Sequence, residues 1–460
     1  MSGDAAKGKI FHAYDVRGVY GTDLDEGIME RIGRAIATVL KASAVLVGHD
    51  MRESSIPLQA ALVKGLTEQG VDVIDIGLCS SSLFYWATQD YPAGVMVTAS
   101  HNPAQYNGCK VCCDGAQPVG EISGLKEIEQ VATAGSFPRA TRVGTVTKKE
   151  VLEEFLRFTT SHLATGKRFR VVVDVANGMG GYTYGALLGR LPNVEIIPMY
   201  FELDGRFPNH EANPLKIETL AALKRRVIEE KADLGVAIDG DEDRIVFVDD
   251  RGEDLPSDLT TALLARQVLR KHPGGTILYD IRQSRVTPEE ITAAGGRAVM
   301  TRVGHSFIKM AMREHDGAWG GELSGHFYNR EVQNAECTQL TFFQMLNLLT
   351  QEDKPLSALV APLRARYAKI PETNFTVPDP RAVIAALDRE YAARPDVVGV
   401  SRIDGVRLDF SEWWCNVRAS NTEPLLRLNL EARTPAMRDM LLAELTARIK
   451  SLSAINAPNA

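Results

Sequence analysis

A strand–helix–strand pattern recurs three times along the chain and limits the folds that the chain can adopt. The copies lie at residues 44–76, 168–199 and 276–303. In each one, an apolar run rich in β-branched residues is followed by a helical pattern and a second apolar run. Such units form parallel sheets covered by helices, because the crossover returns the chain to the same sheet. The pattern predicts three α/β domains with parallel sheets. Residue identity between the copies is weak, which argues against a solenoid.

The last part of the chain follows a different pattern. Apolar runs at residues 375–377, 405–410, 413–417 and 425–432 are predicted as strands, and residues 381–394 and 435–450 as helices. Strands in succession with flanking helices are typical of an α+β domain. The full length of 460 residues is also too long for one ordinary core. We therefore predict four domains, at residues 1–148, 149–252, 253–366 and 367–460.

Composition excludes several classes of function. The formal net charge of −7 gives no basic field for nucleic acid or for an anionic membrane. The sequence has no run of about 18 apolar residues and no apolar leader. We therefore expect a cytoplasmic protein that binds neither nucleic acid nor a membrane. Six cysteines in this length do not form a disulfide framework. Cys109, Cys112 and Cys113 lie in a strand-like run without a second Cys/His pair at zinc spacing, which favours reduced structural thiols.

Residues 95–103 combine an apolar strand with an abrupt turn. Ser100 and His101 follow the run Val-Met-Val-Thr-Ala, and the Asn-Pro pair behind them ends it. The two side chains are therefore expected on a tight loop at a strand end, where open α/β sheets place ligands. An ordinary polar turn is the alternative, because a short motif also occurs by chance.

In the second predicted domain, the apolar runs that flank residues 239–244 are predicted to form a hairpin with an acidic turn at its tip. Asp239, Asp241 and Asp243 alternate with glycine and glutamate there, and Arg244 follows them. Carboxylates at this spacing can converge on one hard cation such as Mg²⁺. An EF-hand is excluded, because its sixth and twelfth positions require glycine and glutamate. A solvated acidic turn is the alternative, but three like charges so close would repel one another without a cation.

Three later segments carry weaker signals. In residues 320–328, Glu322 and Ser324 offer hydrogen-bond acceptors suited to sugar hydroxyls, although a plain loop shows the same composition. His305 lies at the start of a predicted helix, where it would meet an anion or serve a structural role. Residues 418–424 gather an arginine, two hydroxyls and an amide between two strands, which favours either a phosphate grip or a simple turn. The chain has no Walker motif, which argues against a nucleoside triphosphatase.

Together, and in this order, these segments resemble the α-D-phosphohexomutase family, and most closely its phosphomannomutase/phosphoglucomutase branch. The resemblance covers the whole chain. It implies three α/β domains and a C-terminal α+β domain around a central active-site cleft. It also implies an enzyme that interconverts hexose 1-phosphate and hexose 6-phosphate of mannose, glucose or both, through a phosphoserine and a 1,6-bisphosphate. One Mg²⁺ ion and a hexose 1,6-bisphosphate activator are implied as cofactors, and the protein would be a monomer or dimer.

The resemblance also assigns roles to individual residues. Ser100 corresponds to the phosphoserine and, with Asp239, Asp241 and Asp243, to the metal ligands. The positions around the transferred phosphoryl group correspond to Arg17, His101, Lys110, Arg244 and His305. Glu322 and Ser324 correspond to contacts with sugar hydroxyls, and the non-reacting phosphate would be held by Arg418, Ser420, Asn421 and Thr422. Tyr14 and Arg282 complete the expected substrate-binding set.

Details of the sequence bear on the branch and on the preferred sugar. Residues 106–108 (Tyr-Asn-Gly) and Leu323 in the sugar loop favour this branch over phosphoglucosamine mutase, which typically has glutamine in place of the leucine. Arg282 stands where some members carry lysine, and Val303 where they carry threonine, so the preferred sugar stays open. Two other classes share parts of the pattern. These are a metal-dependent serine sugar phosphatase and a non-enzymatic sugar-phosphate sensor, which would be expected to lose Ser100 or an aspartate.

Overall fold

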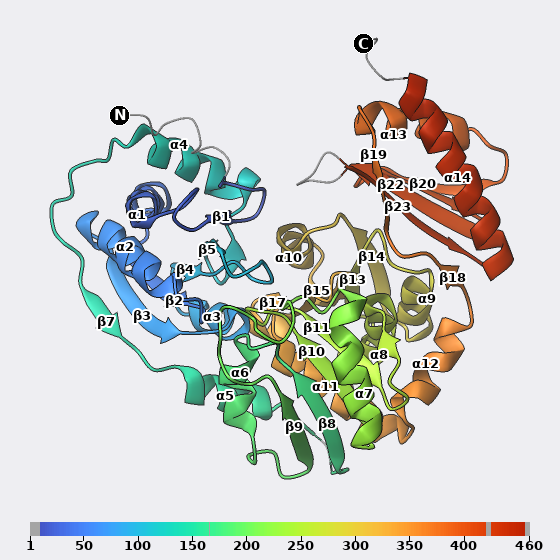
Figure 1. The fold of residues 1–460 in the computed structure, drawn as a ribbon, viewed down its shortest axis with the longest axis horizontal. Coiled ribbons are helices and arrows are strands. Elements are labelled where there is room, and N and C mark those ends of the chain that lie inside the picture. The colour runs from blue at the N-terminus through green and yellow to red at the C-terminus, as the bar shows by residue number, and fades with distance from the viewer. Residues whose placement is uncertain (1–9, 165, 420–424, 456–460) are drawn as a thin grey trace.

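The computed structural model describes residues 10–164, 166–419 and 425–455, which form four sheets in chain order (Figure 1). We number the four domains after these sheets; the residue boundaries given above stay a prediction. In Figure 1 the first and last domains lie on opposite sides, and the second and third lie between them. No helix of the described residues is long and apolar enough to cross a membrane.

The first domain has a sheet in the order β1-β5-β4-β2-β3-β7, with β6 beside β5. Its elements are β1 (Val16–Val19), α1 (Glu26–Leu40), β2 (Ala44–His49), α2 (Ser55–Glu68), β3 (Asp72–Leu78), α3 (Ser81–Thr88), β4 (Ala93–Val97), β5 (Tyr106–Cys113), β6 (Gln117–Pro118), α4 (Lys126–Ala134) and β7 (Val146–Lys148). Helix α1 begins where the Asp25 side chain accepts a hydrogen bond from the Ile28 amide at 2.7 Å, a normal N-cap. The three neighbouring cysteines lie on β5 as free thiols.

The second and third domains repeat one design. The second sheet has the order β12-β11-β10-β8-β9, with β8 (Phe169–Asp174), β9 (Val194–Met199), β10 (Leu234–Ile238), β11 (Ile245–Asp249) and β12 (Asp254–Leu255). Its helices are α5 (Leu152–Thr160), α6 (Gly180–Thr183) and α7 (Ala221–Glu229). The third sheet has the order β14-β13-β15-β16-β17, with β13 (Thr276–Asp280), β14 (Arg297–Thr301), β15 (Gly317–Gly321), β16 (Phe327–Asn329) and β17 (Ala335–Glu336). Its helices are α8 (Ser257–Lys271), α9 (Val286–Ala293), α10 (His305–Glu314), α11 (Thr338–Glu352) and α12 (Leu356–Arg364).

The fourth domain is an antiparallel sheet in the order β18-β23-β22-β21-β20, with β19 also paired to β23. Its strands are β18 (Ala368–Lys369), β19 (Thr373–Thr376), β20 (Val397–Ser401), β21 (Val406–Phe410), β22 (Trp413–Ala419) and β23 (Leu425–Ala432), and its helices are α13 (Pro380–Tyr391) and α14 (Pro435–Ile455). Strands in succession with flanking helices confirm the predicted α+β domain.

The first three sheets are mixed. The parallel strands are β4-β2-β3-β7 in the first sheet, β10-β8-β9 in the second and β14-β13-β15 in the third, and a strand that follows a short loop then runs antiparallel beside them. The antiparallel pairs are β4 with β5, β10 with β11, and β15 with β16. The predicted α/β domains are therefore confirmed, with parallel pairing confined to one side of each sheet.

One apolar core runs through the first three domains, the first domain has a second core of its own, and the core of the fourth domain is separate from both. The shared core joins Phe84 of α3, Phe247 of β11 and Phe342 of α11. The separate core lies between the fourth sheet and helices α13 and α14, around Leu428 and Leu445. Because no apolar cluster among the described residues crosses from the third domain to the fourth, their junction depends on polar contacts such as the Lys369–Asp258 ion pair at 2.5 Å.

Candidate active site

The predicted site segments occupy equivalent places in the four domains. In each of the first three sheets, the segment is the loop that joins a strand of the parallel part to the antiparallel strand beside it. Ser100 lies between β4 and β5, the three aspartates lie between β10 and β11, and Glu322 lies between β15 and β16. The fourth segment follows Arg418 between β22 and β23. The repeated design therefore supplies one loop per domain.

Ser100 lies in a tight loop in contact with the acidic turn. Its backbone has φ 51°, in the left-handed region that residues with a side chain rarely adopt, and its amide donates to the Thr98 hydroxyl at 3.0 Å. The Ser100 Oγ donates to Asp239 Oδ2 at 3.2 Å and lies 3.2 Å from His101 Nδ1. Ser100 is 3% exposed. The hydroxyl is thus held at the boundary between the first and second domains.

The three predicted metal-binding aspartates converge, because β10 and β11 form an antiparallel hairpin with the acidic turn at its tip. Asp239, Asp241 and Asp243 are all buried, and each offers a carboxylate oxygen within 4.8 Å of the others. Asp241 Oδ1 and Asp243 Oδ1 are buried and form no hydrogen bond. Burial raises the pKa of Asp239 well above its usual range, and the Asp243 and Asp241 charges add to that rise. Such a set of oxygens fits a hard divalent cation.

Lys110 of β5 reaches the same turn from the first domain. Its Nζ lies 2.5 Å from Asp241 Oδ2 and 2.6 Å from Asp243 Oδ2. Burial opposes the charged form of Lys110, but the Asp241 and Asp243 carboxylates hold its pKa well above the usual range. The same lysine, with His326, holds the pKa of Asp243 well below its usual range despite burial. Arg244 Nε also lies 3.8 Å from Asp239 Oδ2 and 3.9 Å from Asp243 Oδ1, so two cations face the three carboxylates of the turn.

Side chains that sequence analysis missed hold this turn in place. The Ser81 hydroxyl, at the start of α3, donates to Asp241 Oδ2 at 2.7 Å. Glu242, in the same turn, accepts hydrogen bonds from the hydroxyls of Thr183 at 2.5 Å and Thr338 at 3.2 Å. Burial raises the pKa of Glu242 to about 8. The sequence gives no signal for these contacts, because their partners lie far away along the chain.

Arginine and histidine side chains surround the serine loop. Arg17 Nη1 donates to Asn102 Oδ1 at 2.7 Å, and Arg244 Nε donates to His326 Nε2 at 3.3 Å. Burial lowers the pKa of His101 well below its ordinary value, and the charges of Arg244 and Arg17 lower it further. His101 is therefore neutral beside a cluster of cations. Such a cluster suits an anionic group at the serine.

The sugar loop joins this network through His326, which sequence analysis also missed. His326 Nδ1 lies 2.9 Å from Ser324 Oγ, and its Nε2 lies 3.3 Å from Asp243 Oδ1. Glu322 accepts from the Gly304 amide at 2.7 Å and from the Tyr328 hydroxyl at 2.5 Å. These contacts fix the positions of Glu322 and Ser324 relative to the acidic turn.

His305 and Tyr14 lie together beside the sugar loop. Helix α10 begins at His305, and the His305 ring makes an edge contact with Tyr14 at 5.3 Å between centroids and stacks near His326 at 6.3 Å. Burial lowers the pKa of His305 well below its ordinary value, and the charge of Lys309 in the next turn lowers it further. The structure thus brings these two predicted residues together from the first and third domains.

Arg418 belongs to a cluster built around Glu372. The Glu372 carboxylate accepts from Arg418 Nη2 at 3.3 Å, from Arg427 Nη1 at 3.1 Å and from the Asn429 amide at 3.0 Å. Arg282 Nη1 lies 4.0 Å from the same carboxylate, and its Nε donates to Asp280 at 3.0 Å. Two arginines of the fourth domain and one of the third therefore meet at a glutamate that the sequence does not single out.

Three predicted phosphate-binding residues, Ser420, Asn421 and Thr422, lie outside the described residues. Val303, one of the two departures noted above, donates its amide to Asp404 of the fourth domain at 3.1 Å. This contact, with that of Arg407 Nη1 to the Ile281 carbonyl at 2.7 Å, joins the third and fourth domains next to Arg282.

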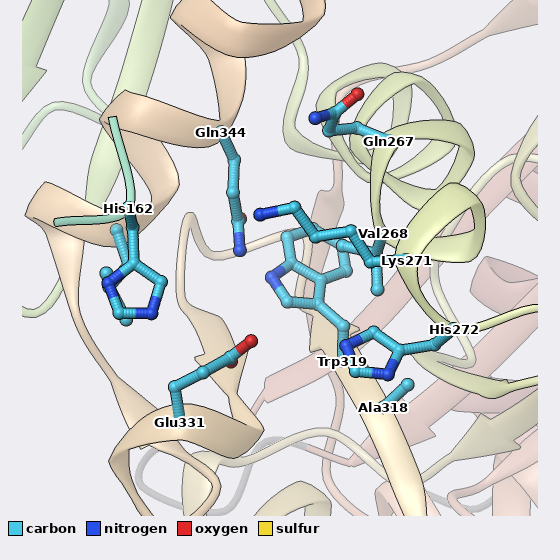
Figure 2. A pocket seen from close by; sticks show the side chains of 10 residues that line it. His162, Gln267, Val268, Lys271, His272, Ala318, Trp319, Glu331 and Gln344 are labelled. Atoms are coloured by element: carbon cyan, nitrogen blue, oxygen red, sulfur yellow. The ribbon is translucent and has the colours of Figure 1, made fainter. Parts of the chain in front are cut away.

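One small cavity lies outside this network, and a larger one borders it. One of about 20 Å³, drawn in Figure 2, is lined by Gln267 and Lys271 of α8, Gln344 of α11, Trp319 of β15 and their neighbours. It has room for about one water molecule, not for a sugar. The other, of about 400 Å³, lies at the junction of the third and fourth domains and reaches the site at Leu323 and Glu372.

Comparison with known proteins identifies the family. Four family models match in succession and cover most of the chain. They describe the phosphoglucomutase/phosphomannomutase alpha/beta/alpha domains I, II and III, at residues 8–139, 150–252 and 256–367, and the C-terminal domain, at residues 372–448. The chain belongs to the phosphoglucomutase/phosphomannomutase family. The predicted family membership is confirmed.

Individual relatives agree over almost the whole length of the chain. A phosphomannomutase of Salmonella montevideo is 36% identical over 433 residues, which are 92% of this chain and 94% of the relative. Phosphohexose mutases of Xanthomonas campestris pv. campestris are 38% identical over 451 residues, or 96% and 98% of the two chains. The crystal structure of a phosphoglucomutase/phosphomannomutase family protein from Burkholderia thailandensis superposes with a TM-score of 0.90 at 28% identity, over 99% of each chain. The four-domain α/β fold and the assignment as a mutase, an intramolecular phosphotransferase, are thereby confirmed.

Proposed function

We propose that this mutase interconverts the 1- and 6-phosphates of mannose, glucose or both by passing a phosphoryl group through Ser100. The observation that carries the proposal is the position of the Ser100 Oγ, 3.2 Å from Asp239 at the point where the loops of the first and second domains meet. The phosphoserine gives its phosphoryl group to the free hydroxyl of the sugar phosphate. The resulting 1,6-bisphosphate reverses its orientation in the site and returns its other phosphoryl group to Ser100. The hexose 1,6-bisphosphate therefore also serves as activator.

Charge stabilisation is the main contribution of the protein to such a transfer, because the phosphoryl group carries negative charge through the transition state. Arg17, Lys110 and Arg244 supply positive charge around Ser100. His101, held neutral by burial, lies 3.2 Å from the Ser100 Oγ, and we assign proton exchange with the reacting hydroxyls to His101 and His305. Each of these residues is placed by contacts from a different element, so the charges are arranged before the substrate arrives.

A magnesium ion fits the acidic turn. Asp239, Asp241 and Asp243 would hold it together with the oxygen on Ser100, and the two buried carboxylate oxygens without hydrogen bonds support that assignment. When bound, one Mg²⁺ would neutralise charge on the phosphoryl group.

In this proposal the third and fourth domains hold the substrate, together with Tyr14 of the first domain. Glu322 and Ser324 bind sugar hydroxyls, and Tyr14 and Arg282 border the sugar. Arg418, with Ser420, Asn421 and Thr422, binds the phosphate that is not reacting. Because the sugar binds in two orientations, this one set of residues must accept either phosphate. Hexose phosphates are the expected partners, and no nucleic acid is expected to bind. In this proposal the protein acts as a monomer or dimer.

A metal-dependent phosphatase is the alternative that shares Ser100 and the aspartates. The separate core of the fourth domain supports a mutase instead, because a domain with its own core can close over the substrate and exclude water. Exclusion of water protects the phosphoserine from hydrolysis.

Turnover of mannose 1-phosphate and glucose 1-phosphate with Mg²⁺ and glucose 1,6-bisphosphate tests the proposal. We expect hexose 6-phosphate to form without inorganic phosphate, and the substitution Ser100→Ala to abolish most turnover while substrate affinity stays nearly unchanged. Ser161→Ala, in the second domain away from the site, is the matched control and keeps full activity. Wild-type turnover in Ser100→Ala, or release of inorganic phosphate at the rate of turnover, would refute the mutase proposal.

A further inference from the structure

Arg52, in the segment between β2 and α2, lies directly beneath the serine loop. It is 1% exposed. Its two terminal nitrogens donate to four backbone carbonyls of that loop: Nη2 to Ser100 at 2.8 Å and Asn102 at 2.7 Å, and Nη1 to Pro103 at 2.9 Å and Tyr106 at 3.1 Å. Its Nε donates to Asp50 Oδ2 at 3.2 Å. All five N–H groups of the guanidinium are thus used, four of them on the serine loop.

Asp50 connects this arginine to the amide of Ser100. Its Oδ1 accepts from the Arg52 amide at 3.0 Å, and its Oδ2 accepts from the Thr98 hydroxyl at 2.7 Å. The Thr98 hydroxyl in turn accepts from the Ser100 amide at 3.0 Å. Both the amide and the carbonyl of Ser100 are therefore fixed by one buried ion pair.

The second domain closes over the same arrangement. A methyl group at Gly205 would lie 2.8 Å from the Arg52 Cα, and the Phe207 ring centroid lies 5.2 Å from the guanidinium carbon. The backbone of the metal loop also approaches closely, because a Cβ at Gly240 would lie 2.5 Å from the Ser100 carbonyl oxygen. That carbonyl is therefore packed between Arg52 and the acidic turn.

We infer that Arg52 is a positioning residue for the phosphoryl transfer. A tight turn with a left-handed residue brings carbonyl oxygens together on one side of the loop. They repel one another there unless hydrogen-bond donors bind them. The rigid fork of a guanidinium binds several carbonyls at once, whereas an ammonium is a single point charge with three donors. Arg52 therefore sets the direction of the Ser100 Oγ through the backbone and touches no substrate. The inference rests on the proposed role of Ser100.

The substitution Arg52→Lys separates positioning from overall charge. It keeps the positive charge but cannot donate to four carbonyls. Because a displacement of about 1 Å at a reacting group can cost about a hundredfold, we expect kcat to fall about a hundredfold. The KM for hexose 1-phosphate should stay within about threefold, since the proposed sugar and phosphate contacts lie on other loops. An unfolded fraction would also lower the apparent kcat with KM unchanged, so kcat is expressed per folded protein, measured by circular dichroism.

The experiment compares wild type, Arg52→Lys, Thr98→Val and the control Arg330→Lys. Arg330 also donates to backbone carbonyls, including that of Gly317 at 3.0 Å, but lies on the third domain away from Ser100. Thr98→Val keeps the volume and removes the link from Asp50 to the Ser100 amide, so the inference can be tested even if Arg52→Lys folds poorly. We measure kcat, KM, amide exchange over residues 98–106 and phosphorylation by glucose 1,6-bisphosphate.

We expect Arg52→Lys and Thr98→Val to lower kcat while KM stays unchanged. Amide exchange should accelerate in residues 98–106 of both variants. Arg330→Lys should match the wild type in every measurement. Arg52→Lys or Thr98→Val with wild-type kcat would overturn the inference. A wild-type protein that accepts no phosphoryl group from the bisphosphate would instead refute the proposed function, so the two failures are distinct.

Discussion

Replacement of Arg418 by alanine should weaken the binding of both phosphates of the sugar by the same factor. Arg418 is 2% exposed, and its Nη2 lies 3.3 Å from Glu372, so its guanidinium is held in place before a phosphate binds. A charge-assisted bidentate contact in a partly closed site contributes about 2–3 kcal/mol, which corresponds to about 30- to 150-fold in KM. We expect this increase for the 1-phosphate and for the 6-phosphate.

The same variant should remain folded. Without Arg418, the Glu372 carboxylate still accepts from Arg427 at 3.1 Å and from Asn429 at 3.0 Å. No buried charge is therefore left alone, and the loss in the free energy of unfolding should stay below about 3 kcal/mol, the lower end for breaking a buried pair. Denaturant unfolding of the variant and the wild type measures this difference.

Initial rates in both directions supply the assay for Arg418→Ala, with the 1,6-bisphosphate saturating. Arg402→Ala is a matched control in the same domain, because Arg402 pairs with Asp388 at the surface. An increase in KM for one phosphate only would refute the idea that a single cluster holds both orientations. An unchanged KM for both would remove Arg418 from the substrate site.

Three further outcomes are expected. Asp241→Asn should weaken Mg²⁺ binding, measured by calorimetry, and lower activity by several orders of magnitude; activity that persists in excess chelator would contradict this. Gly240→Ala should lower kcat about a hundredfold, because its Cβ would lie 2.5 Å from the Ser100 carbonyl; the control Gly399→Ala, whose Cβ would meet nothing closer than 3.6 Å, should be neutral. Mannose and glucose 1-phosphates should give kcat/KM values within about tenfold, or about 1.4 kcal/mol. The reason is that Glu322 and Ser324 are proposed to bind hydroxyls that both sugars share. A thousandfold preference measured on one preparation would show that the site distinguishes the sugars at O2.

Local patterns predicted much of the fold. Strand β23 has the bounds of its predicted apolar run, and strand β21 and helix α13 begin within one residue of the predicted positions. The antiparallel pair β10 and β11 was predicted as a hairpin, but the antiparallel strands of the first and third sheets were not, because an apolar run does not show in which direction it pairs. That direction is set by the short site loops, each of which turns the chain back beside its own strand.

The site was predicted where one segment carries several polar residues, as in the acidic turn. Residues that act through distant partners gave no such signal. Arg52 meets the serine loop about fifty residues along the chain, and Glu372 collects arginines from two domains. In the sequence, a single arginine or glutamate looks like an ordinary surface residue, so only the tertiary structure shows what it contacts.

Transfer of a phosphoryl group to Ser100 is the central claim, and the mass of the intact protein tests it most directly. The protein is measured after excess hexose monophosphate and again after glucose 1,6-bisphosphate, and the modified peptide is then sequenced. We predict a reversible gain of one phosphoryl group, located on Ser100 and absent in Ser100→Ala. No gain in mass, or a phosphoryl group on another residue, would contradict the account.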